Sequence, residues 1–259
     1  MEQQTIFITG AAAGIGAATA RRFARGGWLV GLADRDAEGL RRLADELGAS
    51  QCRVHVLDVT DADAFAVELG AFVESAGRLD LLFNNAGVLV SDDFETLGAD
   101  RYGPMIDVNL KGVVNGALAA FPHLKATPGS RLVNTCSASA IFGAPGFAVY
   151  SATKFAVRGL TEALSVEWTR HGITACDILP MFVGTAMIES VGNRTSMDRM
   201  GVRLGPDDVA AAAWRAAHWP RWWPRIHFFV GLQAVFLAWT ARLVPTFLNR
   251  WITRQITGY

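Results

Sequence analysis

Apolar positions along the chain follow two alternating patterns. Short runs rich in Val, Ile, Leu and Phe are each followed by a longer segment in which apolar residues recur every three or four positions. The short runs are typical of strands buried on both faces, and the longer segments are typical of helices with one apolar face. The runs that predict strands are residues 5–9, 28–34, 52–59, 79–87, 131–136, 172–179 and 226–230.

Helical spacing fills the gaps between these strands. The segments that predict helices are 17–26, 36–48, 61–76, 99–125, 149–170 and 206–217. Strands that alternate with helices indicate right-handed crossovers, so we expect an α/β fold with one doubly wound parallel sheet of about seven strands. Residues 186–205 show no clear period and predict a mobile flap over a pocket.

No linker or internal repeat divides the chain, which predicts one catalytic domain over residues 1–230 and an extension over residues 231–259. The extension contains two helical segments, 232–243 and 246–257, separated at Pro245. The first segment is apolar on nearly all sides. The second has one apolar face, formed by Phe247, Leu248, Trp251, Ile252 and Ile256.

The chain holds 24 basic and 24 acidic residues, so it has no net charge that would attract nucleic acid. The charges are unevenly placed, however. Six arginines and no acid follow Asp208, which gives residues 209–259 a net charge of +6 and the rest of the chain −6. Six of the eight tryptophans lie in the same C-terminal region.

Two interpretations of the extension follow from this composition. Its apolar faces pack on the domain or on a second subunit, or else Trp and Phe beside Arg place it in a membrane interface. Its longest uncharged run, residues 226–241, is too short to span a bilayer. The three widely spaced cysteines indicate neither a disulfide framework nor a metal site, and the N-terminus lacks a secretory pattern. We expect a cytoplasmic protein, with peripheral membrane contact as the alternative.

A glycine-rich turn follows the first predicted strand. Gly10, Gly14 and Gly16 stand between that strand and a helical segment. Such a turn binds phosphate, because backbone N–H groups and the positive end of the helix dipole point at the anion and glycine lets it approach. The alternative is a tight turn that binds nothing.

Asp34 ends the second predicted strand, where an acid is placed to bind the ribose hydroxyls of a dinucleotide. Its carboxylate would repel a 2′-phosphate, which favours NAD over NADP. Arg35 follows directly and would weaken this preference, so NADP stays an alternative cofactor. The structural alternative for Asp34 is to cap the helix that begins near Asp36.

Tyr150 and Lys154 lie four positions apart in a helical segment, so their side chains share one face. A nearby ammonium favours the phenolate and lowers the pKa of a tyrosine from its ordinary value of about 10. Such a tyrosine can exchange a proton with a substrate oxygen, and Ser137 would hydrogen-bond the same oxygen. Cys136, next to Ser137, is interpreted as a small buried residue.

Together these motifs resemble the short-chain dehydrogenase/reductase family, whose members have a single Rossmann-fold domain. The resemblance covers residues 5–217. It rests on motifs that stand in the family's order and spacing, with Ser137 thirteen positions before Tyr150. The matching residues are the cofactor turn Thr9, Gly10, Gly14, Ile15 and Gly16, the strand-four motif Asn84, Asn85, Ala86 and Gly87, and the tetrad Asn109, Ser137, Tyr150 and Lys154.

The resemblance implies an oxidoreductase that transfers a hydride between a nicotinamide cofactor and a secondary alcohol or ketone. Tyr150 would be the general acid/base and Ser137 would orient the substrate oxygen. Lys154 would bind the nicotinamide ribose and lower the Tyr150 pKa, helped by the positive nicotinamide, and Asn109 would hold a water linking it to solvent. The implied cofactor-binding residues are Gly10, Ala13, Gly14, Ile15, Gly16, Asp34, Arg35, Asp58, Val59, Asn85, Ala86, Gly87, Tyr150, Lys154, Pro180, Val183 and Thr185.

Some of these residues have structural alternatives, since Asn109 would also satisfy backbone groups and Thr185 would also cap a helix. Two features depart from the family pattern. Met181 replaces the usual glycine after Pro180, and the extension exceeds the family's short C-terminus. An apolar extension predicts a lipophilic alcohol or ketone as substrate.

The resemblance also implies a homodimer or homotetramer. Two other functions stay open: an NADPH-dependent carbonyl reductase, with Arg35 overriding Asp34, and a non-enzymatic nucleotide-sensing scaffold. The complete tetrad argues against the scaffold, which has no physical need for Ser137, Tyr150 and Lys154 together.

Overall fold

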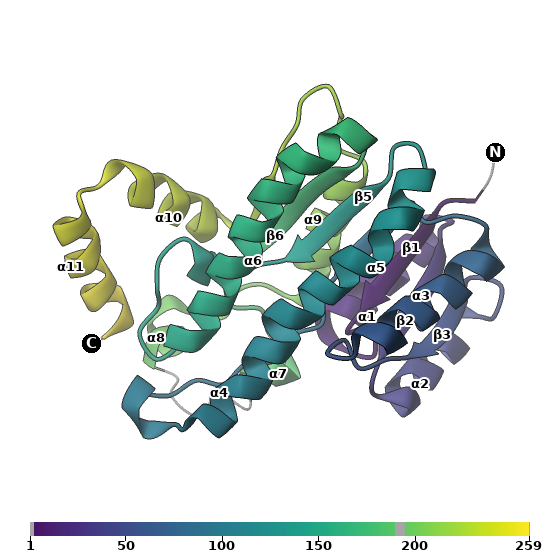
Figure 1. Cartoon of the computed structure of the whole chain (residues 1–259). Coiled ribbons are helices and arrows are strands. Elements are labelled where there is room, and N and C mark those ends of the chain that lie inside the picture. The colour runs from purple at the N-terminus through teal and green to yellow at the C-terminus, as the bar shows by residue number, and fades with distance from the viewer. Residues whose placement is uncertain (1–2, 190–194, 259) are drawn as a thin grey trace.

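The computed structural model describes residues 3–189 and 195–258, and at its centre lies a sheet of seven strands (Figure 1). The strands are β1 Thr5–Thr9, β2 Leu29–Asp34, β3 Cys52–Val56, β4 Leu81–Asn84, β5 Arg131–Thr135, β6 Thr174–Pro180 and β7 His227–Val230. They follow the order β3-β2-β1-β4-β5-β6-β7, and every pairing is parallel. The predicted α/β fold with a parallel sheet of about seven strands is confirmed.

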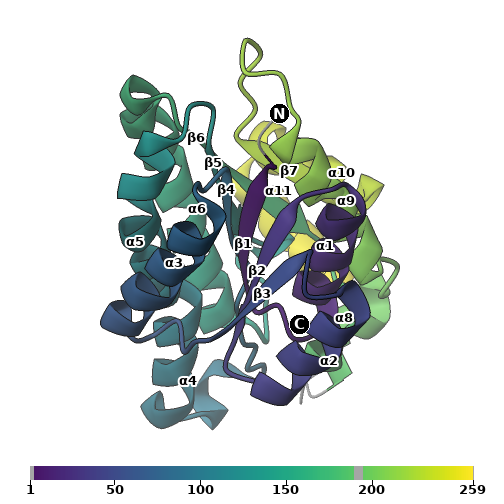
Figure 2. The same cartoon turned by 90° about the vertical axis from the view of Figure 1, so that its right-hand side faces the viewer.

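Helices cover both faces of the sheet (Figure 2). Helices α1, α2 and α9 pack on one face, and α3, α5 and α6 pack on the other. The helices are α1 Gly14–Arg25, α2 Ala37–Leu47, α3 Ala62–Ala76, α4 Ala99–Ile106, α5 Gly112–Ala126, α6 Ala148–Glu167, α7 Ala186–Glu189, α8 Thr195–Met200, α9 Pro206–Ala217, α10 Leu232–Leu243 and α11 Thr246–Thr257. Short 3₁₀ turns occur at Phe94–Thr96, Ala138–Ala140 and Trp168–His171.

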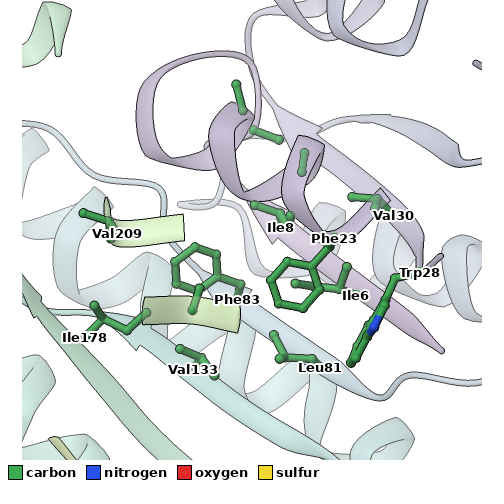
Figure 3. Close-up of a cluster of buried hydrophobic side chains, with 14 of the residues drawn as sticks. Ile6, Ile8, Phe23, Trp28, Val30, Leu81, Phe83, Val133, Ile178 and Val209 are labelled. Atoms are coloured by element: carbon green, nitrogen blue, oxygen red, sulfur yellow. The ribbon is translucent and has the colours of Figure 1, made fainter. Parts of the chain in front are cut away.

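The core on the α1 and α9 side shows why the strands read as continuous apolar runs. Ile6, Ile8 and Val30 project from neighbouring strands onto the helices and are fully buried (Figure 3). Phe23 of α1 packs edge-on against Trp28, with ring centroids 5.0 Å apart. A strand covered by helices on both faces excludes water from both sides, so it has no polar alternation.

The strand order places a crevice beside β1. After β1 the chain builds β2 and β3 on one side, and then returns to place β4 on the other side of β1. In a doubly wound sheet, ligands bind at the carboxyl ends of the strands where the order reverses. Both Gly10 and Asn85 directly follow strands at this point.

The long helix predicted over residues 99–125 is interrupted. A π-helical turn, Asp107–Lys111, separates α4 from α5. Such a turn adds one residue to the helix and changes the direction of the side chains within it. It frequently occurs at functional sites. Asn109 lies in this turn, so the interruption falls on a residue of the predicted tetrad.

The segment predicted as an irregular flap, residues 186–205, contains the short helices α7 and α8. These helices are too short for a helical period to show in the sequence. Residues 190–194 lie outside the described part of the chain.

The extension forms two helices with the predicted bounds, α10 and α11, and Pro245 stands between them. Figure 1 shows both helices at the margin of the molecule, with the end of α11 turning back toward α8. Within residues 3–189 and 195–258, no helix has the length and apolar character needed to cross a membrane.

Candidate active site

A cavity of about 310 Å³ opens at the carboxyl ends of the strands on both sides of the crevice. Its wall contains 13 of the 17 predicted cofactor-binding residues, together with Ser137. These 13 residues are Gly10, Ala13, Gly14, Ile15, Asp34, Asn85, Ala86, Gly87, Tyr150, Lys154, Pro180, Val183 and Thr185. Residues far apart in sequence therefore meet in one pocket, as the resemblance implies.

The glycine-rich turn brings the backbone close to both the pocket and the sheet. Gly10 and Gly14 have φ values of 69° and 54°, in the left-handed region that side chains disfavour. A Cβ on Gly10 would stand 2.9 Å from the Cα of Ala86, so the two loops touch through backbone. A Cβ on Gly16 would collide with the Gly10 carbonyl, which lets α1 pack tightly against β1.

The N-terminus of α1 is left open toward the pocket. Ala13 precedes the helix, and no side chain in the described part of the chain caps it. The first N–H groups of a helix have no partner within the helix and carry the positive end of its dipole. This uncapped end, beside two glycines without Cβ atoms, fits the pyrophosphate of a dinucleotide.

Asp34 lies in the pocket wall and also supports the glycine-rich turn. Its Oδ2 accepts a hydrogen bond of 3.1 Å from the Ala12 N–H, and its Oδ1 accepts one of 3.0 Å from the Asp36 N–H. The helix cap is Asp36, whose Oδ1 accepts from the Gly39 N–H at 2.9 Å. The capping role considered for Asp34 therefore belongs to Asp36, and the Asp34 carboxylate stays at the pocket.

Four predicted cofactor residues lie outside the pocket wall: Gly16, Arg35, Asp58 and Val59. Gly16 allows α1 to pack against the Gly10 carbonyl and does not line the pocket. Val59 is buried against Gly112. Asp58 is exposed, and its Oδ1 accepts hydrogen bonds from the N–H and hydroxyl groups of Thr60. These bonds, with a smaller effect from the Arg35 charge, lower the Asp58 pKa. Arg35 thus interacts with Asp58 rather than with the wall.

Asn85 fixes the loop after β4 to its neighbours. Its Nδ2 donates a hydrogen bond of 3.0 Å to the Thr9 carbonyl, and its own N–H donates to the Thr9 hydroxyl at 3.0 Å. The Thr135 hydroxyl donates to Asn85 Oδ1 at 3.3 Å. One side chain therefore connects the ends of β1, β4 and β5, and its partners Thr9 and Thr135 are the polar residues that end β1 and β5.

Asn109 holds the next part of the same loop. Its Oδ1 accepts a hydrogen bond of 2.8 Å from the Val88 N–H, and its Nδ2 donates one of 2.9 Å to the Val88 carbonyl. The side chain is fully buried and outside the pocket wall. Asn109 thus satisfies backbone groups, as the structural alternative expected, but these groups belong to Val88 in the loop after β4 and not to its own helix. A Cβ on Gly87 would stand 3.3 Å from Asn109 Oδ1 and 3.8 Å from Lys154 Nζ, so these groups lie around one glycine.

Ser137, Tyr150 and Lys154 converge on the pocket from β5 and α6. Ser137 stands just after β5, and its side chain hydrogen-bonds with that of Tyr150. Lys154 lies one helical turn after Tyr150, with Nζ 5.7 Å from the centroid of the tyrosine ring. Serine and tyrosine can therefore share one substrate oxygen, while the ammonium lies behind the ring.

The ionisation of this group differs from the sequence expectation. Burial raises the pKa of Tyr150 to about 12, and the hydrogen bond with Ser137 only partly offsets it. Burial also lowers the pKa of Lys154, whose Nζ donates a 2.9 Å hydrogen bond to the Thr135 carbonyl. The predicted lowering of the Tyr150 pKa by Lys154 is therefore not found in the protein alone, because the loss of water around both groups dominates.

Cys136 is buried beside this group, as expected for a small core residue. Its thiol donates to the Lys154 carbonyl at 3.2 Å, and burial raises the Cys136 pKa to about 12. A thiol with so high a pKa is not a nucleophile at neutral pH.

The rest of the pocket wall is mostly apolar, and the sequence indicated it only through Met181 and the predicted flap over residues 186–205. Met181, which departs from the family pattern, lies in it, as do residues of the flap and one residue of the extension. The larger apolar side chains are Leu89, Phe142, Phe147, Met181, Phe182, Met187, Ile188 and Met200. Thr257 near the end of α11 is fully buried and completes the wall.

The arrangement fits a dinucleotide with a nicotinamide end. The open N-terminus of α1 suits the pyrophosphate, Asp34 suits a ribose diol, and Lys154 with Tyr150 lies at the far end of the same cavity. The part of the chain that the structure describes contains no cluster of His, Cys, Asp and Glu that would hold a metal.

Comparison with known proteins identifies the family of the chain. The sequence profile described as short chain dehydrogenase matches residues 4–196. The oxidoreductase UcpA of Escherichia coli K12 is 38% identical over 196 residues, which cover 74% of each chain.

Solved structures agree as well. The 3-ketoacyl-(acyl-carrier-protein) reductase of Brucella melitensis, complexed with NADH, has a TM-score of 0.80 and 28% identity, covering 88% of this chain and 97% of that one. The alcohol dehydrogenase of the archaeon Thermococcus sibiricus, complexed with 5-hydroxy-NADP, has a TM-score of 0.78 and 28% identity, covering 88% and 96%. The chain therefore belongs to the short-chain dehydrogenase family and is an oxidoreductase that uses a nicotinamide cofactor.

Proposed function

We propose that the protein interconverts an apolar secondary alcohol and its ketone, with NAD as the preferred cofactor. The observation that carries this proposal is the convergence of Ser137, Tyr150 and Lys154 on a pocket whose far wall is built from Met, Phe, Leu and Ile side chains. The two solved relatives described above are a ketoacyl reductase and an alcohol dehydrogenase, and both of these activities interconvert a carbonyl and an alcohol.

The protein's own groups would handle the proton. In alcohol oxidation, the phenolate oxygen of Tyr150 takes the hydroxyl proton as the carbonyl forms, and in reduction the Tyr150 hydroxyl returns it. The Ser137 hydroxyl donates a hydrogen bond to the substrate oxygen and holds it beside Tyr150. The nicotinamide, when bound, accepts or supplies the hydride and adds a positive charge that favours the phenolate. Lys154 would bind the nicotinamide ribose.

The apolar wall supports a lipophilic substrate. Phe147, Ile188 and Met197 form a buried cluster against which Phe182 and Leu89 pack. Met181 adds its side chain where the family pattern has glycine, which narrows the nicotinamide end of the pocket. Each buried methylene of a substrate contributes about 0.8 kcal/mol in such surroundings, so longer alkyl or ring systems should bind more tightly.

NAD is favoured because Asp34 lines the pocket while Arg35 does not. The Asp34 carboxylate is held by the Ala12 and Asp36 N–H groups, so it cannot swing away from a ribose without losing both hydrogen bonds. A 2′-phosphate placed beside it would meet a fixed negative charge. Arg35 is exposed and its charge acts on Asp58.

The decisive experiment follows the absorbance of reduced nicotinamide during oxidation of secondary alcohols from short and polar to long-chain and cyclic. We expect turnover with NAD that rises with apolar size and is lost in Tyr150→Phe. Good turnover of polar alcohols only would reject the apolar substrate. Tight cofactor binding with no turnover of any alcohol or ketone would favour a nucleotide-sensing role.

Cofactor choice is tested separately with Asp34→Asn. The amide keeps an acceptor for Ala12 but removes the charge, so kcat/KM with NADP should rise about tenfold relative to NAD. Arg35→Gln is the matched control and should change the ratio little. Preference of the unmodified protein for NADP, lost in Arg35→Gln, would show that Arg35 governs and that the NAD assignment is wrong.

A further inference from the structure

Helix α10 presents an apolar stripe to the outside of the molecule. The stripe consists of Leu232, Val235, Phe236, Trp239 and Leu243, all of which are exposed. They stand at positions i, i+3, i+4, i+7 and i+11, so they share one face of the helix. Phe236 and Trp239 expose 67% and 65% of their surface, whereas Ala234 on the inner side is fully buried. The helix therefore packs on the domain with small residues and turns its large ones outward.

Helix α11 is oriented the same way. Phe247 and Trp251 stand one turn apart and are exposed, as are Arg250 and Arg254 beside them, while Thr257, one turn after Arg254, is fully buried. A helix that packs only on its own domain buries its apolar face and exposes its polar one. Here the buried end is a threonine and the outer face joins aromatic and guanidinium groups.

We call these outer residues of α10 and α11 the tail face. It consists of Leu232, Val235, Phe236, Trp239, Leu243, Phe247, Leu248, Arg250, Trp251 and Arg254. Large exposed apolar side chains gathered on neighbouring helices in this way mark an interaction site.

The charges of the extension favour an anionic lipid surface over a second copy of the chain as its partner. Residues 232–259 contain three arginines and no acid, whereas residues 1–208 carry a net charge of −6. Pairing of two copies through their extensions would bring positive charge together with no acid from either extension. An anionic lipid surface instead offers negative headgroups to the arginines and a hydrocarbon boundary to Trp and Phe, the side chains enriched at that depth.

The tail face is connected to the active site through α11. Thr257 near the end of α11 lies in the pocket wall together with Met200 of α8, and Trp251 of the tail face stands six positions earlier in the same helix. The Arg199 guanidinium of α8 donates a 3.0 Å hydrogen bond to the Gln255 carbonyl, which joins the two helices. Helix α11 thus contributes residues both to the pocket wall and to the tail face.

We propose that the tail face docks the protein on an anionic phospholipid bilayer, and that docking places the apolar pocket where a lipophilic alcohol or ketone can enter from the membrane. The docking itself is independent of the chemistry. Substrate entry rests on the function proposed above.

Vesicle co-sedimentation of the full chain tests docking. We expect binding to vesicles of equal parts phosphatidylcholine and phosphatidylglycerol, and at least about tenfold weaker binding to phosphatidylcholine alone. Trp239→Glu should weaken binding to the mixed vesicles at least about tenfold. Trp222→Glu is the matched control, because Trp222 is 80% exposed but lies outside α10 and α11. It should bind like the unmodified protein, and equal loss in both variants would overturn the assignment of the tail face.

A charge variant and an oligomer measurement separate the remaining outcomes. Arg250→Gln should weaken binding to the mixed vesicles about fivefold, in line with one arginine at an anionic surface. Sedimentation without lipid should give the same mass for the unmodified protein and Trp239→Glu. Absence of vesicle binding, with an oligomer that Trp239→Glu dissociates, would overturn the proposal and make the tail face a subunit contact.

Substrate entry is tested with an apolar alcohol carried in mixed vesicles and a short alcohol dissolved in buffer. Trp239→Glu should lose most of the rate with the vesicle-borne alcohol and keep its rate with the soluble one. Equal rates of both proteins with the vesicle-borne alcohol would reject membrane entry. Vesicle binding without turnover of any alcohol would leave docking intact and reject the proposed function.

Discussion

The ammonium group of Lys154 donates a 2.9 Å hydrogen bond to the backbone carbonyl of Thr135 at the end of β5. This contact ties the catalytic helix α6 to the edge of the sheet where the pocket opens. Only 3% of the surface of Lys154 is exposed, and this burial lowers its pKa. A group with a proposed role in catalysis is therefore held where its charge costs stability.

Lys154→Met should make the protein inactive and more stable. Removing the buried ammonium should raise the free energy of unfolding by about 1 kcal/mol, as when buried charges give way to apolar groups. A lowered lysine pKa means that the folded state binds fewer protons than the unfolded state, so stability of the unmodified protein should rise as the pH approaches 10.5. Thermal unfolding across this range measures both effects.

The variant should lose this pH dependence, and its activity should fall at least about a hundredfold. Lys154→Arg is the control, because it keeps a charge and adds bulk, and it should lower stability. A melting temperature of Lys154→Met below that of the unmodified protein would show that the ammonium stabilises the fold.

The pKa of Tyr150 should lie above that of an ordinary tyrosine until the oxidised cofactor binds. Burial raises its pKa from 10.0 to about 12, and the positive charge of NAD should lower it again because it favours the phenolate. Since folding raises this pKa, its contribution to stability is complete below pH 10.0 and is lost as the pH rises toward about 12. The difference in phenolate absorbance between the unmodified protein and Tyr150→Phe gives the titration directly.

Tyr150→Phe should also be less sensitive to unfolding by alkali, and its activity should fall about 10²- to 10⁴-fold. A difference titration near pH 10.0 in the absence of NAD would contradict the role of burial.

Gly16 and Gly70 should respond in opposite directions to the same added methyl group. A Cβ on Gly16 collides with the Gly10 carbonyl, whereas nothing lies within 4 Å of a Cβ on Gly70 in the interior of α3. Gly16→Ala should lower stability by about 1–3 kcal/mol and weaken dinucleotide binding, because α1 and the turn must separate. Gly70→Ala should raise stability by about 0.5–1 kcal/mol. Urea unfolding midpoints at constant slope measure both, and equal midpoints would refute this packing of α1.

Much of the fold and the site could be predicted from local sequence. The strands are apolar runs that end in polar residues, and the bounds of α10 and α11 follow from Pro245. The glycine turn, Asn85 and the Ser137, Tyr150 and Lys154 group met in one pocket because parallel strands bring their carboxyl ends to one edge.

Long-range packing accounts for what the sequence did not reveal. The two helices of the flap are too short for a helical period to show. The sequence also did not indicate the π turn at Asn109, whose side chain hydrogen-bonds with the distant Val88. Thr257 reaches the pocket because α11 folds back toward α8, which no local pattern encodes. The raised pKa of Tyr150 likewise depends on burial by neighbours from other elements.

A buried pair of ionisable side chains, His227 and Asp177, lies outside the pocket wall. His227 of β7 contacts Asp177 of β6, with Nδ1 2.8 Å from Oδ1, and its Nε2 lies 3.1 Å from Glu162 Oε1 of α6. Asp177 is fully buried, and among the residues described its Oδ2 has no hydrogen-bond partner. Burial raises the Asp177 pKa and the hydrogen bond from His227 opposes that rise. His227 is therefore what makes a buried carboxylate tolerable here.

His227→Phe should destabilise the protein by about 3–5 kcal/mol at neutral pH, because it leaves a buried charge unpaired. Without His227 the Asp177 pKa rises further, so the carboxylate is neutral in acid and the variant loses stability as the pH rises through that raised value. Urea unfolding from mildly acidic to mildly alkaline pH measures this slope. Adding Asp177→Asn to His227→Phe removes the charge and should restore part of the stability and abolish the slope. A double variant as unstable and as pH-dependent as His227→Phe alone would show that the loss comes from packing of β7 rather than from the unpaired carboxylate.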